Sequence, residues 1–298
     1  MIELRNVKKR FKKFTAVSDL SFKVNEGQIV SLIGQNGAGK STTFHMLLDF
    51  FQPDEGEICW DGAPMNWRFR THIGYMPEER GLYPKESIKG QMMYFAALHG
   101  MKRSEAETEL MSWMKKLNVV GEATDKIESL SKGNAQKVQL ISCLMFNPKL
   151  LILDEPFSGL DPVNAELLIE AILKAKRDGT MIVFSTHNMI NVERLSDYIV
   201  MLSHGTTVLQ GRIEDIYKQF GRLSLELEGF SDISILKKCT GIKKLNQIDK
   251  DSFHLQLESE DAGRVIFDKI VRTGYVPVFN QHYPSLDEIF KYEVAVRG

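Results

Sequence analysis

Gly34-Gln35-Asn36-Gly37-Ala38-Gly39-Lys40-Ser41 lies between an apolar run, Gln28 to Ile33, and a helical pattern, Lys40 to Phe50. It matches the phosphate-binding loop G-x-x-x-x-G-K-[ST], which a buried strand enters and a helix leaves. Glycines let backbone N–H groups approach anionic oxygens, and the N-terminus of the following helix faces the phosphates. The stretch therefore predicts a P-loop fold with a site for ATP.

The residues of this loop have separate predicted roles. Lys40 is expected to reach the β- and γ-phosphates, and the Ser41 hydroxyl to ligate Mg²⁺. Further contacts to the nucleotide are expected from the loop and the first turn of the helix, at Gly34, Asn36, Gly37, Ala38, Gly39 and Thr42. ATP and Mg²⁺ are thus the predicted bound groups.

Two later apolar runs also end in polar side chains. Leu150 to Leu153 leads into Asp154 and Glu155, and Met181 to Ser185 leads into Thr186 and His187. Ligands of parallel sheets bind at the carboxyl edge, so we expect these groups near the ATP phosphates. Asp154 is predicted to help hold Mg²⁺ and Glu155 to polarise the attacking water. The alternative is that the two acids only cap the next helix.

The stretch Leu130-Ser131-Lys132-Gly133-Asn134-Ala135-Gln136 resembles a variant of the signature motif of ABC ATPases. Ser158-Gly159-Leu160-Asp161-Pro162 is similar to the D-loop of that family, and these matches occur in family order between Met1 and about Gly221. The resemblance implies ATP hydrolysis in a head-to-tail dimer, in which the signature of one subunit contacts the γ-phosphate held by the other.

The resemblance also implies roles for individual residues. Ser131, Gly133 and Asn134 would bind the nucleotide from the second subunit, and Asp161 would couple the two sites. Phe11 matches the aromatic residue that stacks on adenine. His187 matches the switch histidine, which would hold the γ-phosphate and the transition-state geometry, so the predicted catalytic residues are Lys40, Glu155 and His187.

Two positions depart from the common family pattern. Glu78, at the end of Tyr75-Met76-Pro77-Glu78, stands where most members have glutamine, and the signature carries Lys132 and Asn134 where glycine and glutamine are usual. Together with Pro77 to Pro84, this combination resembles the ATP-binding subunits of ABC-2-type exporters, a subgroup that includes sodium-efflux systems. Glu78 is predicted to be a further metal ligand, because Mg²⁺ prefers anionic oxygen. Alternatively, it points into a groove for a partner and pairs with a basic residue there.

Composition limits the partners of the chain. The net charge of −1 over 298 residues argues against nucleic-acid binding by bulk electrostatics. No apolar run approaches the ~18 residues of a membrane span, and Met1 to Arg5 reads as a strand rather than a signal peptide. Cys59, Cys143 and Cys239 lack the spacing of a metal site. We therefore expect a cytoplasmic chain. The resemblance implies that it lies on the inner face of the membrane when assembled with separately encoded transmembrane permease subunits, and that it forms a homodimer or heterodimer closed by ATP.

The predicted fold class is α/β of the ABC P-loop type, spanning residues 1–221. A mostly parallel core sheet is expected from strands beginning at Gln28, Ile73, Leu150, Met181 and Tyr198. An antiparallel β-subdomain is expected within residues 2–24, extended near Ile58 and Trp60. A helical insert is expected at about residues 85–130, with a capping box at Ser104 to Glu107. Its methionines serve either as core filler or as a groove for a partner helix.

Residues 222–298 predict a small α+β domain, with a ferredoxin-like arrangement as the candidate. Strand patterns occur at Leu223 to Leu227, Phe253 to Leu257 and Val276 to Phe279, and helical patterns at Glu260 to Arg272 and after the capping box Ser285 to Glu288. The segment resembles the accessory C-terminal domain of this subgroup. It is expected either to stabilise a dimer or cover a core, or to sense a ligand.

The leading functional prediction is the ATPase motor of a membrane transporter that works as an exporter. The alternative is a soluble ABC ATPase that acts on ribosomes or DNA. Such proteins usually carry two ATPase cores in one chain or a long coiled-coil insertion, and this chain shows neither pattern.

Overall fold

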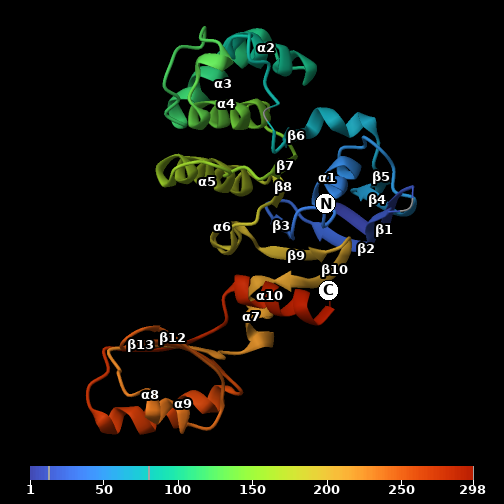
Figure 1. Ribbon diagram of the computed structural model, residues 1–298. Coiled ribbons are helices and arrows are strands. Elements are labelled where there is room, and N and C mark those ends of the chain that lie inside the picture. The colour runs from blue at the N-terminus through green and yellow to red at the C-terminus, as the bar shows by residue number, and fades with distance from the viewer. Residues whose placement is uncertain (13, 80, 298) are drawn as a thin grey trace. The chain divides into compact units, whose positions relative to one another are not determined.

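The computed structural model describes residues 1–12, 14–79 and 81–297, and these form two compact units that divide between Gln210 and Gly211 (Figure 1). The sequence placed this boundary at Gly221. The difference arises from helix α7 (Ile213–Phe220), whose aromatic residues pack on the second unit. Tyr217 stacks on Tyr283 with ring centroids 5.5 Å apart, and Phe220 meets Tyr292 edge-on at 6.1 Å. Arg80, in the stretch that resembles the exporter subgroup, and Gly298 lie outside the described residues.

The first unit is built on a six-stranded sheet in the order β10-β9-β3-β8-β7-β6. Neighbours among β6, β7, β8, β3 and β9 run parallel, as predicted. β3, β7 and β8 are buried along their whole length, which explains why each reads as an unbroken apolar run. The strands are β3 (Ile29–Ile33), β6 (Ile73–Met76), β7 (Leu150–Asp154), β8 (Met181–Ser185), β9 (Tyr198–Ser203) and β10 (Thr206–Arg212).

The predicted antiparallel β-subdomain is a second sheet in the order β2-β1-β4-β5. Leu4 of β1 faces Phe22 of β2 on one side and Ile58 of β4 on the other. These side chains are buried in one cluster with Leu32 and Ile152 of the parallel sheet, so the two sheets share a core. The strands are β1 (Ile2–Phe11), β2 (Phe14–Val24), β4 (Glu55–Trp60) and β5 (Ala63–Pro64), followed by the 3₁₀ turn η1 (Trp67–His72).

The helical insert lies where it was predicted, but its second helix begins differently. Helix α3 has Lys102 at its N-cap and no side-chain capping bond, so the predicted capping box at Ser104 is wrong. Ser104 lies inside the helix, and the Glu107 carboxylate instead pairs with Lys89 at 3.1 Å and with Arg103 at 3.3 Å. The helices of this unit are α1 (Lys40–Leu47), α2 (Ile88–Leu98), α3 (Arg103–Lys116), α4 (Lys132–Leu144), α5 (Pro162–Arg177) and α6 (Met189–Leu195), with the 3₁₀ turn η2 (Ile127–Ser129).

The second unit has the predicted ferredoxin-like arrangement. After α7, its elements follow the order β-α-β-β-α-β, and its antiparallel sheet has the order β12-β13-β11-β14. Leu225, Leu227, Phe253 and Leu255 form its core with apolar residues of the two helices. The elements are β11 (Ser224–Glu228), α8 (Ile233–Lys237), β12 (Ile242–Asp249), β13 (Ser252–Leu257), α9 (Glu260–Ile270), η3 (Val271–Thr273), β14 (Val278–His282) and α10 (Leu286–Arg297).

Candidate functional site

A cavity of about 300 Å³ lies at the carboxyl edge of the parallel sheet, where β3 and β7 end. Most of the residues that the sequence assigns to ATP and its metal line this cavity. The lining comprises Phe14, Ala16, Asn36, Gly37, Gly39, Lys40, Ser41, Thr42, Glu78, Asp154 and Glu155. The structure therefore brings the phosphate loop, the acids after β7 and Glu78 to one place.

The loop between β3 and α1 can be built only with glycine at two positions. Gly39, the N-cap of α1, has φ 103°, and a side chain there would collide with the Ala16 carbonyl oxygen. At Gly34, a Cβ atom would lie 2.5 Å from the carbonyl oxygen of Leu202. Lys40 is buried, and its Nζ donates to the carbonyl oxygens of Gly34 at 2.7 Å and Gln35 at 3.2 Å. The ammonium is thus held inside the curve of the loop, close to where phosphate oxygens would lie.

Ser41 and Asp154 are already in contact. The Ser41 Oγ donates to Asp154 Oδ2 at 3.1 Å, and the Ser185 Oγ donates to the other oxygen, Oδ1. A hydroxyl beside a carboxylate is the pair that holds Mg²⁺ in P-loop ATPases, where phosphates and waters supply the other ligands. Among the described residues, no group of three or more His, Cys, Asp or Glu forms a metal site on its own. The residues present fit an ion that is bound together with a nucleotide.

Glu155 is held firmly at the end of β7. It is buried with φ 49°, a left-handed conformation that is uncommon for a residue with a side chain, and its N–H donates to Ser185 O at 3.1 Å. Its Oε1 lies 3.0 Å from Nδ1 of His187, whose side chain is 77% exposed. Helix α5 is capped by Asp161, which accepts from the N–H of Asn164 at 2.9 Å. The alternative role of Asp154 and Glu155 as caps of this helix is therefore excluded.

Phe14 lines this cavity, whereas the sequence assigned the stacking on adenine to Phe11. Phe11 and Phe14 face each other at the end of the β1–β2 hairpin. Phe11 turns toward Phe51, with ring centroids 5.4 Å apart and planes at 90°, whereas Phe14 lines the cavity and is largely exposed. Sequence reasoning missed Phe14. The only available signal was its place beside Phe11 in the same turn.

The signature residues lie outside this cavity. Ser131 is the N-cap of α4 and accepts from the N–H of Asn134 at 3.3 Å, while Asn134 Oδ1 accepts from the N–H of Val120 at 3.1 Å. Gly133 and Asp161 also do not line the cavity. The chain therefore brings together Lys40, Ser41, Glu78, Asp154 and Glu155, with His187 in contact with Glu155, but it does not bring its own signature to the phosphates.

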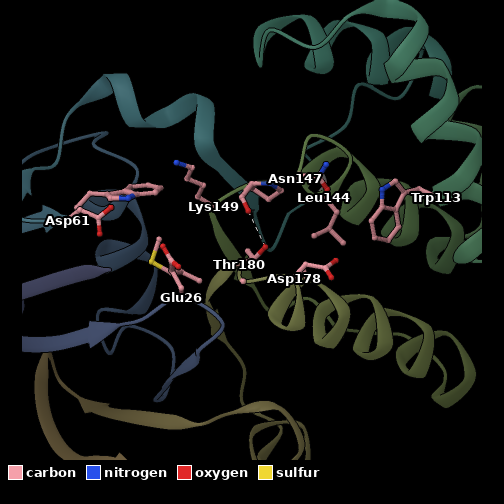
Figure 2. A pocket seen from close by; sticks show the side chains of 13 residues that line it. Glu26, Asp61, Trp113, Leu144, Asn147, Lys149, Asp178 and Thr180 are labelled. Carbon is pink, nitrogen blue, oxygen red and sulfur yellow. Dashed lines mark hydrogen bonds between the residues drawn. The ribbon is translucent and has the colours of Figure 1, made fainter.

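A second hollow, of about 500 Å³, lies at the opposite edge of the sheet (Figure 2). It is bordered by the first residue of β8 and by the turns before β7 and β8, where the Thr180 Oγ1 donates to Pro148 O at 3.1 Å. Glu26 and Asp61 come from turns of the β-subdomain, and Trp113 from α3. Ligands of parallel sheets bind at the carboxyl edge, so this hollow is not part of the ATP site.

Comparison with known proteins identifies the family. The family model "ABC transporter" matches residues 17–158, and the model "ATP-binding protein DrrA1-3-like, C-terminal domain" matches residues 211–294. The chain is 42% identical over 295 residues to the "Uncharacterized ABC transporter ATP-binding protein YhaQ" of Bacillus subtilis, covering 99% of both chains. The chain is an ABC transporter ATP-binding protein.

Further similarities agree with this assignment. The ABC protein is 33% identical over 213 residues to the "Nod factor export ATP-binding protein I" of Burkholderia lata, covering 70% of each. A solved structure, described as "Structure of ATP binding subunit of ABC transporter", superimposes with a TM-score of 0.69 at 31% identity, covering 74% of this chain and 93% of the other. The predicted family, subgroup and fold class are confirmed.

Membership of this family establishes the general activity. ABC ATP-binding proteins bind and hydrolyse ATP, dimerise and work with separate transmembrane subunits. Within the described part of the chain, no helix is both long and apolar enough to span a membrane.

Proposed function

We propose that this ABC ATPase is the motor of an exporter and that it hydrolyses ATP in a head-to-tail dimer. The main observation behind the proposal is that the residues expected to contact ATP lie in two separate places on the chain. Lys40, Ser41, Asp154 and Glu155 meet at one cavity, whereas Ser131 lies outside it. Each chain thus holds only one half of the groups that stabilise the transferred phosphoryl, and a second subunit would supply the other half.

In this proposal the side chains of the cavity bind and orient the reactants. Lys40 and the loop N–H groups hold the β- and γ-phosphates, and Phe14, which lines the same cavity, stacks on the adenine ring. Glu155 accepts a hydrogen bond from the attacking water, and His187, 3.0 Å from Glu155, orients that carboxylate. Mg²⁺, held by Ser41 and Asp154, would neutralise charge on the phosphates when bound.

Export rests on the C-terminal unit and on one relative. Residues 211–294 match the DrrA-like C-terminal domain, and the name of the Burkholderia relative includes "export". The transmembrane partners would be separate permease subunits, which places this chain on the cytoplasmic face of the membrane. Purification of the chain with its native membranes, followed by identification of the membrane proteins that co-purify, tests this part. Recovery with ribosomes or DNA would contradict it.

Two variants test the catalytic part. Lys40→Ala removes the cation at the phosphates and should weaken ATP binding, whereas Glu155→Gln should retain ATP binding and lose hydrolysis by at least about 100-fold. Size-exclusion chromatography with ATP and Mg²⁺ should show a stable dimer for Glu155→Gln and a monomer for Lys40→Ala. Normal hydrolysis by Glu155→Gln would show that Glu155 does not polarise the water.

A further inference from the structure

The ATP cavity has an excess of negative charge. Three carboxylates line it, those of Glu78, Asp154 and Glu155, against one ammonium group, that of Lys40. Asp154 would be offset by the metal ion that it holds, and Glu155 has to remain anionic to polarise water. Glu78 adds a third negative charge, which one metal ion shared with Asp154 would offset only in part, and nucleotide phosphates would add further negative charge beside it. A cation from outside the cavity would relieve this repulsion.

Lys132 is a cation that the folding of its own unit does not explain. It is the first residue of α4, directly after the N-cap Ser131, where the positive end of the helix dipole disfavours a cation. It is exposed, and it forms no ion pair with any residue that the structure describes. Stability alone would favour an acidic or neutral residue at this position.

The ammonium of Lys132 lies against the turn that follows Glu155. A Cβ atom at Gly159 would collide with Lys132 Nζ, so the amine rests on the backbone of this turn. Gly159 has φ 69°, and the same turn ends at Asp161, the N-cap of α5. The N-termini of α4 and α5 and the Lys132 ammonium thus lie on one surface. The Asp161 carboxylate caps α5, whereas the first turn of α4 contains no acidic residue, so Lys132 is available to an anionic partner.

We propose that Lys132 acts in trans: its ammonium enters the ATP cavity of a second copy of this chain and offsets the charge of Glu78 there. This inference rests on the proposed head-to-tail dimer. The partner is a second copy because the two unusual residues have opposite charges. Glu78 adds a carboxylate to the ATP cavity, and Lys132 adds a cation to the surface that carries the signature residues. The fold of a single chain requires neither Glu78 nor Lys132.

The first test measures dimerisation in a Glu155→Gln background. Adding Lys132→Met should raise the ATP-dependent dimer dissociation constant at least about tenfold in sedimentation experiments, because a close charge pair is lost. The affinity of the isolated chain for ATP should not change, and its melting temperature should stay the same or rise. The matched control is Lys102→Met, which removes another exposed lysine at a helix N-terminus of the same unit and should leave the dimer unchanged.

Adding Glu78→Gln to the Glu155→Gln/Lys132→Met chain should restore most of the lost dimer affinity, because the unpaired carboxylate is then removed. If Lys132→Met leaves the dimer as stable as before, or lowers the melting temperature by destabilising α4, Lys132 has no role in trans. If the Glu155→Gln parent itself forms no dimer with ATP, the proposed function fails together with this inference.

The second test separates an effect in trans from one within the same chain. A mixed dimer of Lys132→Met and Lys40→Ala chains contains one site with a normal phosphate loop and a normal Lys132. Its ATPase activity should exceed the average of the two variants measured alone. If Lys132 acted only on its own catalytic turn through Gly159, the same mixed site would stay impaired and mixing would give no gain.

Discussion

At the scale of single residues, Glu78 places a charge where most members of the family have a neutral glutamine. The structure places it at the cavity with Ser41 and Asp154, which agrees with its predicted place near the metal. A carboxylate offers Mg²⁺ a hard anionic oxygen, whereas glutamine offers a neutral carbonyl. The same charge repels a nucleotide that arrives without its metal. Glu78 should therefore link ATP binding to Mg²⁺ more tightly than glutamine would.

Replacing Glu78 by glutamine tests this link. Glu78→Gln should raise the Mg²⁺ concentration for half-maximal ATPase activity, roughly tenfold for the loss of one anionic ligand or water-mediated contact. Metal-free ATP binding should stay the same or improve slightly. A Mg²⁺ titration of both proteins provides the measurement. Superimposable curves, with a defect seen only after a membrane partner is added, would instead support the alternative role of Glu78 in a partner groove.

The sequence predicted which acidic and phosphate-loop residues line the cavity, but not which phenylalanine does. Lys40 and Ser41 sit in a contiguous loop whose backbone geometry is fixed by its glycines, and Asp154 and Glu155 end a buried strand. For these residues, the place in the sequence therefore nearly determines where the side chain lies in the folded protein. Phe11 and Phe14 belong to a hairpin end, where packing of Phe11 on Phe51, from a distant segment, decides which ring faces the cavity.

At the scale of elements, the sequence predicts two similar capping boxes, of which one forms and the other does not. Ser285 and Glu288 form the reciprocal pair: the Ser285 N–H donates to Glu288 Oε2 at 2.9 Å, and the Glu288 N–H donates to Ser285 Oγ at 3.3 Å. In the other case the N-cap is Lys102, two residues before Ser104, and two cations pair with the Glu107 carboxylate. A local motif predicts a cap only where no stronger partner competes for the acid.

Replacing each serine by alanine should destabilise only the helix that has the capping box. Ser285→Ala removes a capping bond worth about 1 kcal/mol, so amide hydrogen exchange in α10 should accelerate roughly fivefold. Ser104→Ala removes no cap and places a better helix former inside α3, so exchange there should be unchanged or slower. Hydrogen exchange followed by mass spectrometry on the full chain measures both. Equal acceleration at the two sites would contradict the assigned caps.

The second unit also shows where strand patterns give too little signal. β12 was not predicted, because its residues are mostly exposed and polar and its register with β13 shifts at two points. Only pairing with β13, at one edge of the sheet, defines it as a strand. The neighbouring α8 has only one buried side chain, that of Leu236, and was likewise missed. Both elements depend on tertiary contacts rather than on local periodicity.

At the scale of the whole molecule, the boundary between the units matters for any attempt to separate them. The residues that line the ATP cavity all precede Gln210, and the ferredoxin-like unit has its own apolar core. α7, which precedes the position that the sequence favoured as the boundary, belongs with α10 through Phe220 and Tyr292. A cut at Gly221 would therefore divide the second unit, whereas a cut at Arg212, the end of β10, would leave both sheets intact.

Two truncated chains should consequently behave differently. Residues 1–212 should fold and bind ATP with an affinity within about twofold of the full chain, because they keep every residue of the cavity. Residues 1–221 should also retain the site, but this fragment includes α7 without Tyr283 and Tyr292, on which Tyr217 and Phe220 pack in the full chain. The exposed aromatic side chains should favour aggregation. Calorimetry with ATP and light scattering at equal concentration measure the two effects. If the longer fragment is the more soluble and more stable of the two, α7 belongs to the ATPase unit and the boundary lies near Gly221 after all.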